Sequence, residues 1–257
     1  MTVEAAAAFL AEVRLAHTRM SGLPPELRPA DVATAYRVQE ALHTALTGAG
    51  LGALAGYKIG CTTSVMQRYL KIDHPCAGGV FAARVYRDAA RLRHGAFVRV
   101  GVECEIAVLL GRDLPPRDRP YAPADVAPAV EAYAPAIEIV DDRWVDYGAV
   151  DTPTLIADDF FNSGCVLGAP RRFDAALDLA AVRGAMSVNG RQIGRGSGAD
   201  ALGSPLNALA WLASTRAGLR AGGLVLTGSM VQTCWAARGD ACAVELEGLG
   251  GARVSFE

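Results

Sequence analysis

The sequence predicts a β-rich α+β fold, on three observations. After residue 56, short runs of apolar and β-branched residues alternate with tight turns rich in Gly, Pro and Asn. Helical patterns are few and do not alternate with the strands as they do in a βαβ array. The chain has no internal repeat, G-x-G-x-x-G motif or P-loop. We therefore expect a strand-dominated domain, residues 56–257, preceded by a helical appendage, residues 1–55.

Composition narrows the class of protein. A chain of 257 residues with 51% hydrophobic and 20% charged residues suits one globular domain with an appendage. The net charge of −2 gives no electrostatic reason to expect a nucleic acid or an anionic membrane as partner. The start lacks a basic segment and is interrupted by Glu4 and Glu12, unlike a signal peptide. Six scattered cysteines without C-x-x-C fit reduced thiols, so we expect a cytoplasmic protein.

Two helices are expected before the strands. Residues 3–19 have the composition of an amphipathic helix. After the turn-rich "SGLPPELRP", a second helix runs from Asp31, a suitable N-cap, to about Leu46, where "TGAGLG" ends it. Its apolar residues repeat at helical spacing: Ala35, Val38, Leu42 and Leu46. Neither helix carries obvious chemistry, so we interpret both as packing or oligomerisation elements.

The pattern changes to strands and tight turns near Gly56. The stretch "AGYKIGC" predicts a short strand that enters a glycine turn. "TTSVMQRYL" predicts a brief helix capped by Thr62 or Thr63. "DHPCAGGVFAARVY" is interpreted as a Gly-rich loop that leads into a strand.

The C-terminal third predicts a hairpin, one long helix and the closing strands. "SVNGRQI" places Asn189-Gly190 between alternating runs, which is typical of a two-residue hairpin turn. A helix is expected from its cap Ser204, through Pro205 at its first position, to Gly222-Gly223. Further strands follow: "LVLTGSMVQ", "ACAVELE" and "ARVSFE".

The stretch "RVGVECEIAVLLGRDL", residues 99–114, predicts a strand with an unusual face. Side chains alternate with period two, so one face is wholly apolar and packs inward: Val100, Val102, Cys104, Ile106, Val108 and Leu110. Glu103 and Glu105 then share the other face, with small neighbours that leave room for them. Two partly buried carboxylates repel each other, and a cation between them relieves that repulsion. The alternative is an exposed edge strand with an ordinary polar face.

A third carboxylate lies in another apolar run. Glu138 alternates with Ile137 and Ile139 in "PAIEIVDDRW". Three carboxylates on two adjacent strands match an oxygen-rich site for a hard divalent cation such as Mg²⁺. No His lies beside these acids in the sequence, and Cys104 belongs to the opposite, apolar face of its strand, so zinc is the less suitable ion.

Two basic residues are candidates for the same site. Lys58, in "GYKIG", reads locally as a lysine whose stem crosses apolar surface to reach solvent. The functional alternative aims it into the site as a proton shuttle or as a donor to an anion. Arg143 follows Glu138 by five residues. It is either a structural ion pair or a group that holds a substrate carboxylate.

Together these residues resemble a known family. "GYKIG", "VECEIAVLLGRDL" and "PAIEIVDDRW", with "IADD…VLG", "ALGSPLNALAWLA" and "LVLTGS", resemble the 2-keto-4-pentenoate hydratase / 2-oxo-hept-4-ene-dioate hydratase group. That group belongs to the fumarylacetoacetate hydrolase superfamily. The resemblance covers the chain from about Gly56 to its end, and helices before it also suit the group.

The resemblance implies a fold and a site. The fold is the superfamily's mixed β-sandwich or roll. Glu103, Glu105 and Glu138 match its metal-binding acids, which carry Mg²⁺ or Mn²⁺, and Lys58 matches its active-site lysine. Thr227, Gly228 and Ser229 would lie near the carboxylate of a small 2-oxo acid substrate. A homo-oligomer and a role in the breakdown of aromatic compounds are implied in the same way.

The resemblance implies a lyase that adds water to an unsaturated 2-oxo acid. A 2-oxo acid decarboxylase or a C–C bond hydrolase on the same scaffold is the alternative. A weakly active assembly partner of a hydratase–decarboxylase complex is a third reading, which the intact set of acids and Lys58 disfavours.

The chain departs from the group's pattern at two places. The loop that commonly reads "EPDYG", with an acid for proton transfer, is "HPCAGG" here, with Cys76 at that place. The group's "ADN" is "ADD", followed by Phe160 and Phe161. Next to the altered loop, His74 could supply an acid/base group near neutral pH, or could be an ordinary loop histidine facing solvent.

Overall fold

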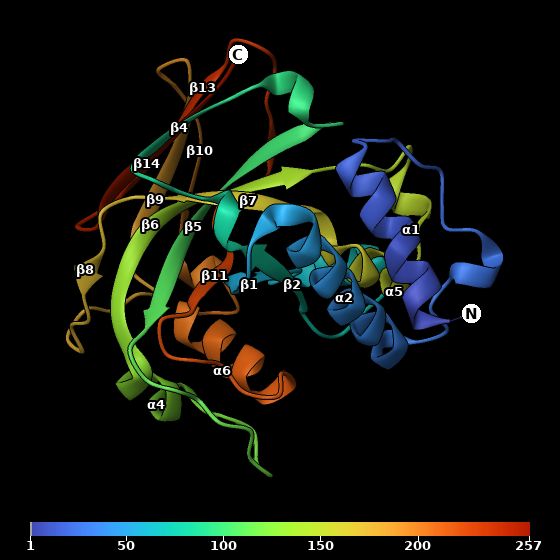
Figure 1. Ribbon diagram of the computed structural model, residues 1–257. Coiled ribbons are helices and arrows are strands. Elements are labelled where there is room, and N and C mark those ends of the chain that lie inside the picture. Colours follow the sequence, from blue (N-terminus) through green and yellow to red (C-terminus); the bar gives the residue numbers. More distant parts are fainter. Residues whose placement is uncertain (1) are drawn as a thin grey trace.

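Two β-sheets and a group of N-terminal helices make up residues 2–257, the part of the chain that this computed structural model describes (Figure 1). In these residues the larger sheet has nine strands, with the order β2-β1-β11-β5-β6-β7-β3, and β12 and β8 pair with β5 and β6. The smaller sheet has five, in the order β10-β9-β13-β14-β4. Both sheets mix parallel and antiparallel pairs. The strand-rich α+β prediction is therefore confirmed.

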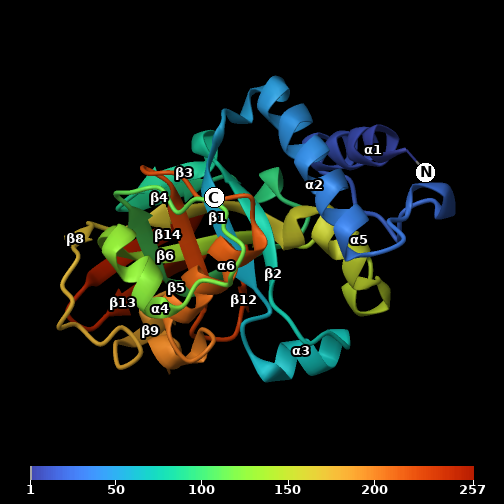
Figure 2. The same ribbon diagram turned by 90° about the horizontal axis from the view of Figure 1, so that it is seen from below.

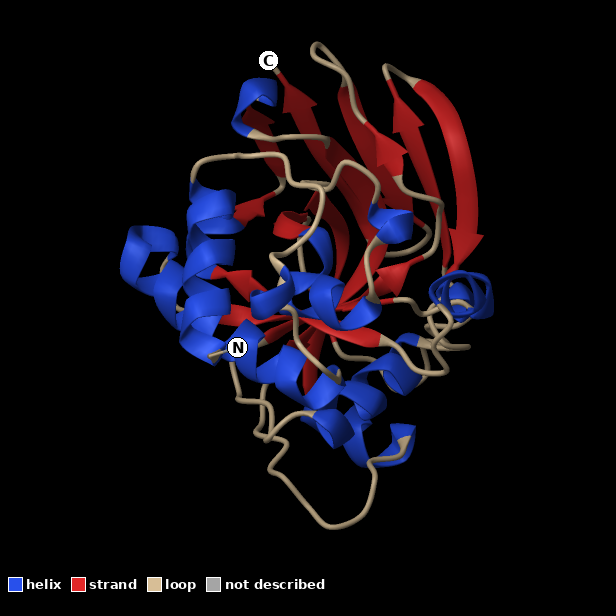
Figure 3. Cartoon of the chain, turned by 90° about the vertical axis from the view of Figure 1, so that its right-hand side faces the viewer, coloured by secondary structure: helices blue, strands red, loops and turns tan. Residues whose placement is uncertain are grey.

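The larger sheet consists of β1 (Leu54–Gly60), β2 (Cys76–Phe81), β3 (Val85–Arg87), β5 (Val100–Leu110), β6 (Val130–Asp141), β7 (Asn162–Leu167), β8 (Arg171–Arg172), β11 (Leu224–Ser229) and β12 (Cys234–Trp235). The smaller sheet consists of β4 (Ala89–Leu92), β9 (Arg183–Val188), β10 (Arg191–Ser197), β13 (Ala241–Leu246) and β14 (Gly250–Phe256). The helices are α1 (Val3–Leu15), α2 (Val32–Leu46), α3 (Ser64–Leu70), α4 (Pro123–Val126), α5 (Thr152–Ala157) and α6 (Pro205–Thr215). Helices α1, α2 and α5 gather to one side of the strands (Figure 1), the side that faces the viewer in Figure 3, and α3 projects from the sheet (Figure 2).

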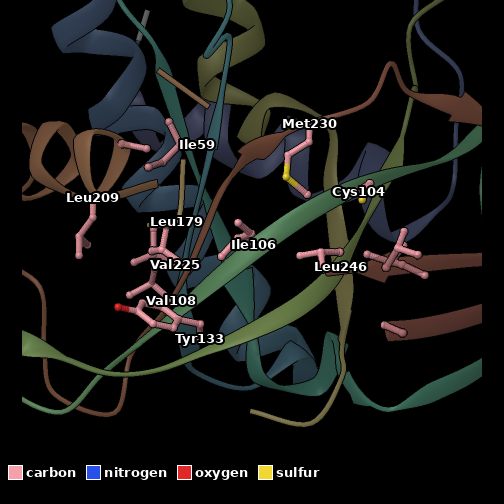
Figure 4. Close-up of a cluster of buried hydrophobic side chains, with 14 of the residues drawn as sticks. Ile59, Cys104, Ile106, Val108, Tyr133, Leu179, Leu209, Val225, Met230 and Leu246 are labelled. Atoms are coloured by element: carbon pink, nitrogen blue, oxygen red, sulfur yellow. The ribbon is translucent and has the colours of Figure 1, made fainter. Parts of the chain in front are cut away.

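Strand β5 is the centre of the core. Its expected apolar face is buried along its whole length, with no side chain more than 1% exposed from Val100 to Leu110. Cys104, Ile106 and Val108 pack with residues of the smaller sheet and of α6, such as Leu246 and Leu209 (Figure 4). Full burial of each such side chain contributes roughly 1.5–3 kcal/mol. That burial fixes the register, so the opposite face of β5 must present Glu103 and Glu105.

The expected caps and the hairpin are confirmed. Asp31 accepts a hydrogen bond from the Thr34 amide at the start of α2. Thr63 caps α3 and Ser204 caps α6 in the same way. Asn189 and Gly190 join β9 to β10 with φ of 51° and 78°, the left-handed pair that a type I′ turn needs.

Three expected boundaries are wrong. Helix α1 ends at Leu15 rather than residue 19, because His17 has φ 51° and the Thr18 amide bonds back to the Val13 carbonyl. These bonds form a Schellman stop. Helix α6 ends at Thr215, well before the two glycines.

The third wrong boundary concerns "CAGG", which is strand β2 rather than a loop. Gly78 and Gly79 pair with Lys58 and Tyr57 of β1. Both glycines are required by close neighbours. A Cβ at Gly78 would lie 2.5 Å from the Asp159 carbonyl oxygen, and one at Gly79 would lie 2.6 Å from His43 Nε2.

The N-terminal helices pack closely on the strand domain. Gln39 of α2 is fully buried and donates to the carbonyls of Ala77 in β2 and Ile156 in α5. Four residues later on the same face, His43 contacts Asp159. The division at residue 55 remains a prediction. No helix among residues 2–257 is long and apolar enough to cross a membrane.

Candidate active site

The three predicted acids meet at one point. Glu103, Glu105 and Glu138 each offer a carboxylate oxygen, and these oxygens lie within 4.8 Å of one another. Antiparallel pairing of β5 with β6 puts Glu103 directly opposite Glu138. Glu105 and Glu138 are fully buried, and Glu103 is partly exposed. The edge-strand alternative is wrong, because β5 lies between β11 and β6 inside the larger sheet.

Each carboxylate is held through one oxygen. Glu105 Oε2 accepts a hydrogen bond of 2.9 Å from the Gly228 amide, and Glu103 Oε1 accepts one from the Thr233 hydroxyl. Glu138 Oε1 accepts from Asn162 Nδ2 at 3.0 Å and from Lys58 Nζ at 3.1 Å. These bonds fix the directions in which the remaining oxygens can bind.

The other oxygens fit a cation. Glu105 Oε1 and Glu138 Oε2 are buried and have no hydrogen-bond partner among the described residues. A buried carboxylate oxygen without a partner is costly unless it coordinates a metal. Oxygen-only donors suit a hard divalent cation, so these residues fit the metal that the family resemblance implies.

The charges lead to the same conclusion. Burial, reinforced by repulsion from Glu138 and Glu103, raises the pKa of Glu105 well above its usual range. Burial also raises the pKa of Glu103. Lys58 is the cation that opposes both shifts, so one positive charge faces three carboxylates. A divalent cation would balance the remaining two charges.

Lys58 lies inside the site rather than on the surface. It belongs to β1, is 3% exposed, and contacts both Glu138 and the ring of Phe160, whose centroid is 5.7 Å from Nζ. Burial lowers the pKa of Lys58, but the glutamates outweigh burial and the net pKa is raised. The surface alternative is therefore wrong, and the ammonium is charged at neutral pH.

A turn that the sequence does not predict lies beside Lys58. Asp159, Phe160 and Phe161 have φ of 59°, 48° and 70°, three consecutive left-handed residues without a glycine. The turn delivers Phe160 to Lys58 and Asn162 to Glu138. Left-handed backbone in bulky residues is rare and has no local sequence signature.

The "LTGS" segment reaches the acids through its backbone. The Gly228 amide bonds Glu105, and Gly228 has φ 115° and lies so close to Thr62 that a Cβ would be 2.5 Å from its methyl group. The Thr227 hydroxyl donates to the Ile106 carbonyl, and the Ser229 hydroxyl donates to the Val231 carbonyl. Only Gly228 of the three is hydrogen-bonded to a glutamate of the cluster.

Arg143 and His74 lie apart from this network. Arg143 is 2% exposed and pairs with Asp158 at 2.9 Å and Asp141 at 3.7 Å. His74 Nδ1 lies 2.8 Å from the Pro75 carbonyl oxygen. Among residues 2–257, no hydrogen bond or ion pair joins either side chain to Lys58 or to the three glutamates.

Cys76 lies in β2 opposite Gly60 and is fully buried. A hydrogen bond with the Cys61 thiol and burial raise the pKa of Cys76 far above that of a free thiol. It is therefore a neutral thiol and does not replace a carboxylate as a charged base.

Comparison with known proteins identifies relatives over the whole chain. Residues 82–257 match the family model described as Fumarylacetoacetate (FAA) hydrolase C-terminal. The 2-keto-4-pentenoate hydratase 1 of Dechloromonas aromatica is 36% identical over 262 residues, covering 100% of this chain and 97% of its own. The 2-hydroxyhexa-2,4-dienoate hydratase of Comamonas testosteroni is 34% identical over 207 residues, covering 78% of this chain and 77% of its own.

A solved structure has the same fold. The 4-oxalocrotonate decarboxylase of Pseudomonas putida G7, complexed with magnesium and adipate, superimposes with a TM-score of 0.92. The match covers 99% of this chain and 97% of that one, at 24% sequence identity. At this identity the likeness concerns the fold alone.

Proposed function

Because the chain belongs to the fumarylacetoacetate hydrolase family, we propose that it is a divalent-metal-dependent hydratase of a small unsaturated 2-oxo acid. One observation carries the proposal. Two buried carboxylate oxygens, on Glu105 and Glu138, have no hydrogen-bond partner within residues 2–257 and lie beside a buried, charged Lys58. The full-length relatives at 36% identity are named 2-keto-4-pentenoate hydratases.

Glu103, Glu105 and Glu138 would hold the cation, Mg²⁺ or Mn²⁺. When bound, it supplies Lewis-acid stabilisation of negative charge on the oxygens of the 2-oxo acid. The protein contributes by holding the carboxylates in fixed directions. The β5–β6 register, the Gly228 amide and Asn162 orient them before substrate arrives.

The reaction moves one proton and adds one water. A 2-hydroxy-2,4-dienoate gains a proton at its far carbon and loses its enol proton, which gives a conjugated 2-oxo acid. Water then adds across the remaining double bond, the hydroxyl to C4 and a proton to C3. Lys58 Nζ, charged and free to donate beyond its bond to Glu138, is the candidate to shuttle a proton or steady the developing charge.

Other groups are kept as candidates with narrower roles. His74 would be a second acid/base group. Arg143, Thr227, Gly228 and Ser229 would bind or position the substrate, and the Gly228 amide is the one with a direct bond to the cluster. For Arg143, two buried ion pairs favour a positioning role over direct contact with substrate.

Decarboxylation is the second candidate. The thiol of Cys76 is neutral, and it stands where related hydratases commonly carry an acid for proton transfer. The lack of that acid favours decarboxylation over hydration. C–C bond hydrolysis and a weakly active assembly partner would share the same scaffold. We further propose a homo-oligomer in the cytoplasm that takes part in aromatic catabolism.

The test is product identification. Purified protein with Mg²⁺ is given fresh 2-hydroxypenta-2,4-dienoate, and the products are followed by NMR. The hydratase proposal predicts 4-hydroxy-2-oxopentanoate and no CO₂. No turnover of this compound, together with CO₂ release from a 2-oxo-3-enedioate, would transfer the assignment to the decarboxylase.

A further inference from the structure

The left-handed turn beside Lys58 is held by an anchor that the proposed reaction does not use. Asp159 is fully buried, and its Oδ1 accepts hydrogen bonds from His43 Nε2 at 2.6 Å and the Gly79 amide at 2.8 Å. Its Oδ2 lies 3.3 Å from the Arg14 guanidinium. Three segments far apart in sequence, α1, α2 and β2, thus converge on one carboxylate.

The Asp159 carboxylate is ionised at neutral pH. Burial opposes ionisation of Asp159, but His43, Arg14 and the Gly79 amide outweigh burial and lower the pKa to about 2. A buried acceptor with three donors is strongly directional, and losing one donor leaves part of its charge uncompensated.

Two glycines make room for the anchor. A Cβ at Gly79 would collide with the His43 ring, and a Cβ at Gly78 would collide with the Asp159 carbonyl. The same position on Gly78 is 3.4 Å from Lys58 Cε, so the lysine stem crosses this strand next to the turn. The "GG" of β2 therefore allows the α2 histidine, the turn and the lysine to meet.

The turn in its left-handed form has two consequences at the site. It sets the Phe160 ring beside Lys58 Nζ, and it starts β7 so that Asn162 reaches Glu138. Left-handed φ at three non-glycine residues persists only where the surroundings determine it. The contacts of the Asp159 carboxylate with His43, Gly79 and Arg14 are the surroundings that hold this turn.

We propose that the His43–Asp159 pair is a positioning device, which holds turn 159–161 so that Phe160 and Asn162 orient Lys58 and Glu138 for the reaction. This rests on the proposed function of the site. Among the described residues, neither side chain is joined to Lys58 or to the three glutamates by a hydrogen bond or ion pair, so both would act through the turn. The N-terminal helix α2 thereby contributes to catalysis as well as to packing.

The test compares two variants of the same helix face. His43→Leu removes the donor to Asp159. Gln39→Leu, one helical turn away, removes the donors to Ala77 and Ile156 and the acceptor for Arg216, none of which belongs to turn 159–161. Both should lower Tm, because each leaves buried acceptors unpaired. Only His43→Leu should lower kcat, by 10–100-fold with KM changed less than threefold, as is usual for residues that orient a catalytic group.

His43→Gln keeps a side-chain N–H for Asp159 and should restore kcat to within a few-fold of wild type. Equal kcat in His43→Leu and Gln39→Leu at matched loss of Tm would overturn the proposal. So would a His43→Gln variant as impaired as His43→Leu.

A second readout does not depend on the reaction. Amide hydrogen exchange in His43→Leu should accelerate at Gly79 and at residues 159–163, with the centre of β5 unchanged. Unchanged exchange there would refute the anchor whatever the activity. A wild-type protein that does not hydrate the dienoate would refute the proposed function, while the exchange result would still decide whether His43 orders the turn.

Discussion

Glu103 of β5 lies directly opposite Glu138 of β6, in the interior of the larger sheet. Like charges at directly opposed positions destabilise a sheet. The pairing nonetheless runs on in both directions, from Val100 opposite Asp141 to Leu110 opposite Val130. The buried apolar face of β5 keeps this register, and the two carboxylates are thereby held ready for a cation.

Removing one carboxylate charge should abolish metal binding and spare the fold. Glu105→Gln keeps the side-chain volume and one oxygen but loses a charge at a buried position. We expect Mn²⁺ affinity to fall by more than the roughly 10–100-fold typical of outer-shell partners, with hydratase activity lost and a cooperative thermal transition retained. Calorimetric Mn²⁺ titration measures this. Glu131→Gln, an exposed glutamate of the same strand as Glu138, is the matched control; unchanged Mn²⁺ affinity in Glu105→Gln would count against the site.

The metal-free protein should lose stability as pH rises. Burial and mutual repulsion raise the pKa of Glu105 and of Glu103, so the folded state holds protons that the unfolded state has released. Above the ordinary Glu value of about 4.3, stability therefore falls until the raised pKa values are passed. Scanning calorimetry in EDTA should give a Tm that decreases from about pH 5, just above the ordinary Glu value, to neutral and higher pH.

Mg²⁺ should raise Tm more at the upper end of that range than at the lower, because protons and metal compete for the same oxygens. Glu105→Gln should flatten the pH dependence. A metal-free Tm that rises steadily with pH would show that the glutamates are not coupled in this way.

Replacing Lys58 should lower kcat without weakening metal binding. Lys58→Met keeps an unbranched apolar stem but removes the positive charge beside Glu138. We expect kcat to fall by about 10²–10⁴-fold, the usual range for a proton-transfer group. Mn²⁺ should bind at least as tightly as in wild type, because a repelling charge is gone. Lys71→Met, at an exposed position after α3, is the control; parallel loss of Mn²⁺ affinity and kcat would assign Lys58 a structural role instead.

His74 can be tested independently of Lys58. If it acts as the second acid/base group, as proposed, His74→Gln lowers kcat by roughly 10²-fold or more and leaves metal binding unaltered. Steady-state kinetics at saturating Mg²⁺ measure this. A kcat equal to that of wild type would remove His74 from the site and leave Lys58 as the proton-transfer group.

The acids were predictable because a strand's period of two determines which side chains share a face. Glu103 and Glu105 had to point together once the apolar face of β5 was assigned to the core. The position of Glu138 followed from its two isoleucine neighbours. In each case the evidence is local, and tertiary packing only confirms it.

The turn at residues 159–161 and its neighbours beside Lys58 depend on contacts between segments that are distant in the sequence. In the left-handed turn at Asp159–Phe161, the Asp159 carboxylate contacts His43, Gly79 and Arg14, and none of these is near it in sequence. For the same reason the local sequence predicts a loop at Gly78 and Gly79, whereas they are strand positions where a side chain would collide. Asn162 has no local feature that marks it as a partner of Glu138.

Anomalous diffraction from crystals grown with Mn²⁺ would show whether Glu103, Glu105 and Glu138 form a divalent-cation centre next to Lys58. We expect a manganese peak within about 2.0–2.6 Å of an oxygen of each glutamate, lost in Glu105→Gln crystals. A fully occupied manganese site elsewhere, with none among these three carboxylates, would contradict it.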